Sequence, residues 1–180
     1  MARWQISVLA AVVLLAGCGG DSGSSASEDY ANSVCGNLST WVTDVNGAIT
    51  SLTDAGLATD KEDVQSAVDQ ATGATDDLLS SLEELGPPET DAGEQAKSEL
   101  DSLGETLRSQ IDTVERALDA DTGAVALAAT VTAALSTAAS AVESTYNDLR
   151  GLDPGGELEE GFQNADDCKS LRDQVDAIGS

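Results

Sequence analysis

The chain has 180 residues, of which 33 are acidic and 8 are basic; it contains no histidine, and only 3% of its residues are aromatic. Its formal net charge of −25 argues against binding to nucleic acid or docking on an anionic membrane, because both are negatively charged. The lack of histidine excludes a histidine-based catalytic triad, a haem site with a histidine ligand and the usual zinc enzyme site. A single domain with its own hydrophobic core is expected at this length.

The N-terminal segment has the pattern of an export signal. Arg3 gives it a basic start, and residues 6–15 (ISVLAAVVLL) form an uncharged apolar run. This run is too short to span a bilayer stably and fits the apolar region of a secretory signal. Leu-Ala-Gly-Cys follows at residues 15–18 and resembles the lipobox of bacterial lipoproteins. An ordinary secretory signal, in which Cys18 has no special role, is the alternative.

The lipobox resemblance implies a domain organisation for the whole chain. In that family the cysteine thiol receives diacylglycerol and signal peptidase II cleaves just before it, which makes residues 1–17 a signal peptide and Cys18 the lipid attachment site. Residues 18–29 then form a lipidated, acidic and flexible Gly/Ser tether. We expect residues 30–153 to form a four-helix bundle and residues 154–180 to form a short helical tail packed on it. Acyl chains would hold the domain at the membrane without embedding it.

Four long segments repeat apolar residues at alternating spacings of three and four, which is the pattern of amphipathic α-helices. They cover residues 30–57, 59–85, 90–120 and 122–150. Thr59 and Glu62 form a capping-box pattern at the start of the second segment, and the sequence Gly-Pro-Pro at 86–88 ends it. Because the connections are short, neighbouring helices should be antiparallel. The predicted fold is therefore all-α, an antiparallel four-helix up-down-up-down bundle with a short helical C-terminal segment and one disulfide.

The fourth segment admits a second interpretation, because residues 122–142 carry no charge and are long enough to span a membrane. On a helical wheel one arc gathers apolar residues, namely Leu127, Val131, Ala134, Leu135, Ala138 and Val142. The opposite arc gathers hydroxyl residues, namely Thr130, Thr132, Ser136, Thr137 and Ser140. A membrane span has no reason to segregate residues in this way. We therefore predict a buried helix of the bundle.

The cysteines provide a test of the predicted topology. With Cys18 lipidated, Cys35 and Cys168 remain, and two remaining thiols in an exported domain favour one disulfide. In a bundle of four antiparallel helices the chain returns to the end where it began, so Cys35 in the first helix should meet Cys168 in the tail. A redox-active pair is the alternative, but it lacks a Cys-x-x-Cys spacing and a nearby basic cluster.

We predict no catalytic residue, metal site or cofactor. The three lysines do not occur in a Ser-x-x-Lys motif, and glycine-rich phosphate loops are absent. Residues 119–123 (DADTG) resemble the start of a calcium loop but lack its third acidic position and its closing glutamate. We interpret the acidic clusters as a solvated surface, with calcium binding and paired-carboxylate catalysis as alternatives. Trp41 is predicted to pack in the core.

The predicted function follows from the anchor, the bundle and the acidity. The chain resembles small lipid-anchored bacterial proteins with a helical bundle and one disulfide, and its residue usage is similar to that of a GC-rich actinobacterium. We expect a non-enzymatic interaction module at the outer face of the cell membrane, held there through Cys18. Its partner would be an envelope protein or a basic ligand, not nucleic acid. The alternatives are a lipoprotein that binds a small molecule or a divalent cation, the latter near residues 157–167, and a carboxylate-based hydrolase.

Overall fold

The computed structural model describes residues 26–55, 60–120 and 123–178, and this part of the chain is helical with no strand. Its helices are α1 (Ala26–Ala55), α2 (Lys61–Leu85), α3 (Asp91–Asp119), α4 (Ala124–Gly151), α5 (Glu157–Asn164) and α6 (Asp166–Ile178). The all-α prediction is confirmed, and the predicted helical tail consists of two short helices.

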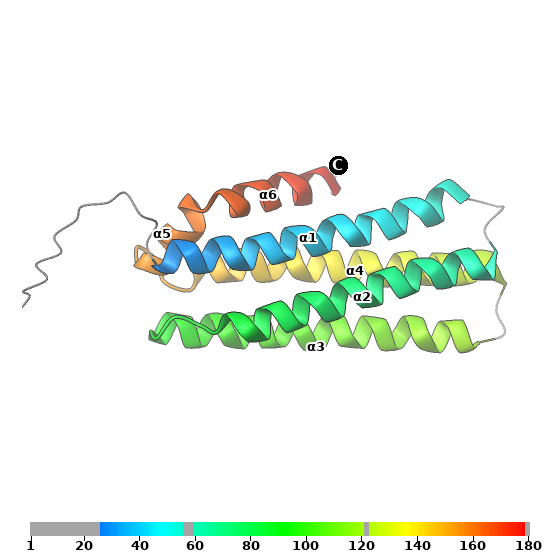
Figure 1. Cartoon of the computed structure of the whole chain (residues 1–180), viewed down its shortest axis with the longest axis horizontal. Helices are drawn as coiled ribbons and strands as arrows, with labels where there is room; N and C mark the ends of the chain where they lie inside the picture. Colours follow the sequence, from blue (N-terminus) through cyan, green and yellow to red (C-terminus); the bar gives the residue numbers. More distant parts are fainter. Residues whose placement is uncertain (1–25, 56–59, 121–122, 179–180) are drawn as a thin grey trace, which may run out of the picture.

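The helices form a bundle. Figure 1 shows α1 to α4 lying lengthwise beside one another, with α5 at one end and α6 running back along α1. The most extensive packing joins α1 to α2 and α3 to α4, whereas α2 contacts α3 over a much smaller area. Helix α1 also packs against α5 and α6, so the C-terminal tail is part of the bundle. The buried apolar residues of all six helices belong to one core.

The helix ends agree with the sequence patterns to within a few residues, with one correction at α2. The N-cap of α2 is Asp60, whose side chain accepts hydrogen bonds from the backbone N–H groups of Glu62 and Asp63. The predicted pairing of Thr59 with Glu62 is therefore wrong by one residue, and Thr59 itself lies outside the described residues. A carboxylate such as that of Asp60 is a stronger hydrogen-bond acceptor than a threonine hydroxyl, and its negative charge is favoured at a helix N-terminus.

Helix α1 begins at Ala26, four residues before Tyr30, where the sequence pattern placed its start. The last part of the predicted tether is therefore helical. At the far end of α2, Leu85 is the last helical residue, and Gly86 follows with a φ of 61°, a conformation that favours glycine. The chain thus turns where Gly-Pro-Pro predicts.

Helix α4 places its buried residues on the arc that the helical wheel predicts. They include Leu127, Val131, Ala134, Leu135, Ala138 and Val142. Val125, on another face, is 54% exposed. By length and composition alone, α4 is the helix of the described part of the chain that could cross a membrane. Its buried arc packs into the same core as the other helices.

Two glycines in helices predict opposite effects of the same substitution. A Cβ atom on Gly161 of α5 would lie 2.6 Å from the carbonyl oxygen of Ser27 in α1, whereas a Cβ on Gly73 of α2 would meet nothing within 4 Å. We expect Gly161→Ala to lower the free energy of unfolding by about 1–3 kcal/mol, because backbone would have to move. Gly73→Ala should raise it by roughly 0.5–1 kcal/mol, since alanine favours a helix interior. Urea unfolding followed by circular dichroism measures both, and a loss of stability in Gly73→Ala would contradict the contact argument.

Candidate functional site

The predicted disulfide is present and joins the two ends of the folded chain. Cys35 of α1 and Cys168 of α6 are bonded across a sequence separation of 133 residues, with their Cα atoms 4.9 Å apart. Both residues are fully buried, with an exposed fraction of 0%. A redox-active disulfide has to expose a sulfur atom to an attacking thiol. The complete burial of this one is typical of a structural bond.

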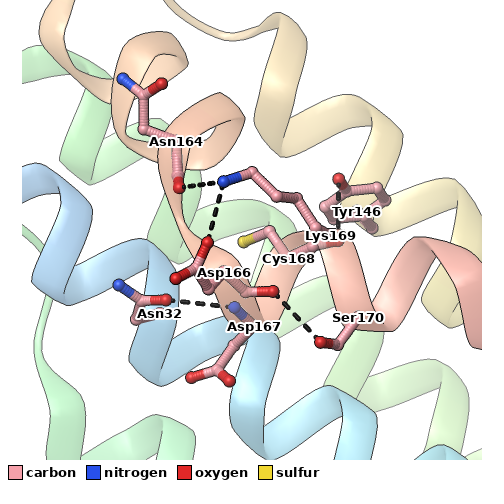
Figure 2. Close-up of polar contacts among 8 residues, drawn as sticks. All are labelled: Asn32, Tyr146, Asn164, Asp166, Asp167, Cys168, Lys169 and Ser170. Carbon is pink, nitrogen blue, oxygen red and sulfur yellow. Dashed lines mark hydrogen bonds and ion pairs between the residues drawn. The ribbon is translucent and has the colours of Figure 1, made fainter.

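Hydrogen bonds tie α6 to its neighbours around the disulfide (Figure 2). Asn32 Oδ1 of α1 accepts a hydrogen bond from the backbone N–H of Asp167 at 3.2 Å. The buried hydroxyl of Tyr146, on α4, donates to the carbonyl oxygen of Cys168 at 3.4 Å. The start of α6 is therefore fixed to both α1 and α4.

The acidic cluster at residues 157–167 does not converge on one point. Asp166 Oδ1 forms an ion pair with Lys169 Nζ at 2.9 Å, and Glu159 accepts hydrogen bonds from Gly155 and Gln163. Within the described ranges no group of three or more cysteine or acidic side chains is close enough to hold a metal ion. Two residues of the calcium-like segment 119–123 lie outside those ranges. The carboxylates are thus spread over the surface.

A cavity of about 350 Å³ lies between α2 and α3, which pack together less extensively than α1 with α2 or α3 with α4. This volume falls within the range of small-molecule sites. Apolar residues line it, namely Leu79 and Leu82 of α2, Pro87 of the connection and Leu100 of α3, together with Gly104 and Tyr30. A Cβ on Gly104 would lie 3.1 Å from Leu79 Cδ2, so the absence of a side chain there helps to keep the cavity open.

Charged side chains form the rim of this cavity. Arg108 Nη2 lies 3.3 Å from Glu83 Oε1 and links α3 to α2, while Lys97 Nζ lies 2.6 Å from Asp101 Oδ2. All four side chains are more than half exposed, so each ion pair stabilises the fold by no more than about 1 kcal/mol. Glu105 also lines the cavity and has no ion-pair partner in the described part of the chain. The rim can therefore exchange its partners for those of a ligand at little cost.

Tyr30 closes one side of the cavity. It is 7% exposed, and its ring meets that of Phe162 edge-on with the centroids 6.4 Å apart. Burial raises the pKa of its phenol to about 12. The hydroxyl therefore stays neutral over the physiological range, when it can donate or accept a hydrogen bond. Tyr30 and Phe162 thus pack against each other in the core.

Alkaline pH provides a prediction for Tyr30. Because the pKa of its phenol is raised in the folded protein, the folded state binds this proton more tightly than the unfolded state does. The resulting stability is fully present below pH 10 and is lost as the pH rises towards about 12. We expect the urea midpoint to fall between pH 10 and pH 11.5 and to fall less in Tyr30→Phe, which cannot ionise. If the urea midpoint fell equally in Tyr30→Phe and in the protein that keeps Tyr30, ionisation of Tyr30 would not be the cause of the loss.

Trp41 is buried in the core at 2% exposure, and its Nε1 donates to Thr75 Oγ1 at 3.0 Å, a partner that the sequence pattern did not indicate. Cys18, the predicted lipid attachment site, lies outside the described residues.

Comparisons with protein families, curated proteins and solved structures found no match to this chain.

Proposed function

We propose that this chain is a lipoprotein anchored through Cys18 at the outer face of the cell membrane, where it acts as a non-enzymatic interaction module. The observation that carries this proposal is the buried Cys35–Cys168 disulfide. Such bonds persist in oxidising compartments and are rare in the cytosol, so the bond supports export. The Leu-Ala-Gly-Cys sequence at residues 15–18 supports lipid attachment.

The proposal includes an antiparallel, up-down-up-down arrangement of α1 to α4. The short connections between these helices support it, and so does the course of the chain in Figure 1, where successive helices run in opposite directions. The disulfide is consistent with this arrangement, since it joins the start of α1 to the segment after α4. In this topology α2 and α3 are a hairpin that extends along one side of the bundle.

Exposed carboxylates on α2 and α3 support a positively charged partner. Exposed carboxylates of α2 are Glu62, Asp63, Asp69, Asp76, Asp77, Glu83 and Glu84, and those of α3 include Glu94, Asp101, Glu105, Asp112 and Glu115. Charge complementarity on this scale speeds encounter with a basic partner and disfavours acidic ones. The buried polar side chains of the described residues are Thr75 and Thr145, so the pair of buried carboxylates that the hydrolase alternative requires is not found there.

Crosslinking and co-purification from native membranes test this function. The anchored protein is compared with a Cys18→Ala form, which the lipidation machinery cannot modify. We expect one basic envelope protein to be enriched with the anchored form, and its recovery to fall when carboxylates of α2 are replaced, as in Asp76→Asn with Asp77→Asn. Glu143→Gln with Asp148→Asn removes the same charge from exposed positions of α4 and should leave recovery unchanged. Equal recovery of every protein with the anchored protein and with the Cys18→Ala form would contradict the proposal.

The cavity between α2 and α3 favours a second candidate function, the binding of a small amphipathic molecule. Its apolar lining, charged rim and neutral Tyr30 hydroxyl would contact such a molecule. A thermal-shift screen tests this function, because a ligand that binds only the folded state raises the melting temperature. The effect should disappear in Gly104→Leu, which fills the cavity, and persist in Gly73→Leu, where the added side chain starts in open space.

A further inference from the structure

A second cavity, of about 330 Å³, gathers positive charge in this acidic protein. It lies where α4, α5 and α6 meet and is lined by Tyr146, Arg150, Phe162, Gln163, Lys169 and Arg172. Three of these six residues are basic and none is acidic, although the chain has 33 acidic and only 8 basic side chains. The charged residues that line this cavity are therefore all basic, although the chain as a whole is strongly acidic.

Two of the three cations have no acidic partner among the side chains that the structure describes. Within the described ranges neither Arg150 nor Arg172 forms an ion pair, whereas Lys97 and Arg108 each do. The Arg150 guanidinium lies over the Tyr146 ring, 5.5 Å from its centroid, and its buried Nε has no hydrogen-bond acceptor among the described residues. Leaving such a donor unsatisfied costs stability, so an acceptor that the chain does not supply would be favoured here.

The third cation is held at the edge of the same cavity. Lys169 Nζ donates to the Asn164 carbonyl oxygen at 2.8 Å and pairs with Asp166 Oδ1 at 2.9 Å (Figure 2). The Gln163 amide donates to Glu159 Oε1 at 2.7 Å, so Glu159 and Asp166 both accept hydrogen bonds from side chains of α5 and α6. Among the described side chains, the cations of the cavity that lack an ion pair are therefore the two arginines.

We propose that this cavity binds the phosphate group of a phosphate ester. Guanidinium groups bind phosphate oxygens in pairs of parallel hydrogen bonds, and a phosphate has enough oxygens to engage both arginines and Lys169 together. The cavity is larger than a phosphate alone needs and its lining is mostly polar, which leaves space for a hydroxylated ester group such as glycerol. Two sources share this chemistry, the head group of a phospholipid and a soluble phosphate ester.

The position of the cavity is compatible with either source. It is formed with α5 and α6, at the end of the bundle where α1 begins (Figure 1). If the chain is anchored through Cys18, this end is nearest to lipid head groups. Binding of a soluble ester needs no anchor, so the inference stands independently of the proposed lipidation.

Isothermal titration calorimetry tests the inference with the full chain in a nonionic detergent. Inorganic phosphate, glycerol 3-phosphate and short-chain dihexanoyl phosphatidylglycerol are the three probes, each corrected for its heat of dilution into detergent. We expect Arg150→Gln and Arg172→Gln each to weaken binding about ten-fold or more, as loss of a charge-assisted hydrogen bond does. Arg116→Gln is the matched control, because it removes the same charge from an exposed arginine whose hydrogen bonds stay within α3.

The outcomes separate the two sources and can overturn the inference. Arginine-dependent binding of phosphatidylglycerol that exceeds binding of glycerol 3-phosphate identifies a head-group site, and the reverse order identifies a soluble ester. No binding of any probe, or equal weakening by Arg116→Gln, would overturn the inference. Arg172 is exposed, so its substitution should leave the fold intact, and a circular dichroism melting curve checks that Arg150→Gln is folded too.

Discussion

Replacing both bonded cysteines, in Cys35→Ala with Cys168→Ala, is expected to lower the free energy of unfolding by roughly 5 kcal/mol. The bond closes a loop with a sequence separation of 133 residues, so its loss returns a large conformational entropy to the unfolded chain. Total stabilities of single domains are about 5–15 kcal/mol, so this is the largest effect expected of any change considered. Urea unfolding followed by circular dichroism measures it.

The control for this experiment is Cys18→Ala, which removes a cysteine outside the bonded loop. We expect it to leave the urea midpoint unchanged. Because both bonded residues are fully buried, reductant alone should act slowly in the absence of urea and quickly once the protein unfolds. A double variant with the midpoint of the unmodified protein would show that packing of α6 on α1, without the bond, is sufficient to hold the tail.

The helical elements could be predicted because their signal is local. Apolar spacings of three and four define the helices, and Gly86 with the two following prolines defines the end of α2. The disulfide could also be predicted, because only two cysteines remain after Cys18 and the expected topology brings them to one end. Both inferences need only chain order and periodicity.

Other features depend on contacts between segments that are distant in sequence. Residues 26–29 follow a Gly/Ser-rich run and look like part of a tether, but they are helical where Ser27 packs closely against Gly161 of α5. Thr75 is polar, so a search for apolar periodicity does not mark it as a core residue. It lies four residues after Ala71 and three before Leu78, both of which are buried, so its spacing does place it on the buried face of α2.

The basic cavity also depends on contacts between distant segments, so the sequence alone does not predict it. Composition describes an acidic protein, and Arg150 lies in a different helix from Lys169 and Arg172. The sequence does contain a partial signal, since Lys169 and Arg172 are three residues apart and therefore share a helix face. Only the packing of α5 and α6 against α4 brings Arg150 beside them. Net charge is thus a poor guide to the charge of a single site.

Trp41→Ala is expected to lower the free energy of unfolding by about 3–5 kcal/mol, the range for truncating a large buried aromatic side chain. Trp41 is 2% exposed and lies among the largest fully buried side chains, where its removal leaves a cavity in the core. Val125→Ala, at a position that is 54% exposed, is the control and should change stability by less than about 0.5 kcal/mol. Urea unfolding followed by circular dichroism measures both, since the helical signal does not depend on the indole.

The Thr75 partner divides this loss into packing and hydrogen bonding. Thr75→Val keeps the shape of the side chain but leaves the buried Trp41 Nε1 without its acceptor, which should cost about 1–3 kcal/mol. Trp41→Phe removes the donor and much less volume than alanine does. If the hydrogen bond matters in its own right, combining Trp41→Phe with Thr75→Val should cost less than the sum of the two single changes. Strict additivity of the two changes would mean that Trp41 stabilises the core through packing alone. The Thr75 hydroxyl would then be tolerated in the core because it also donates a hydrogen bond to the Ala71 carbonyl oxygen at 2.8 Å.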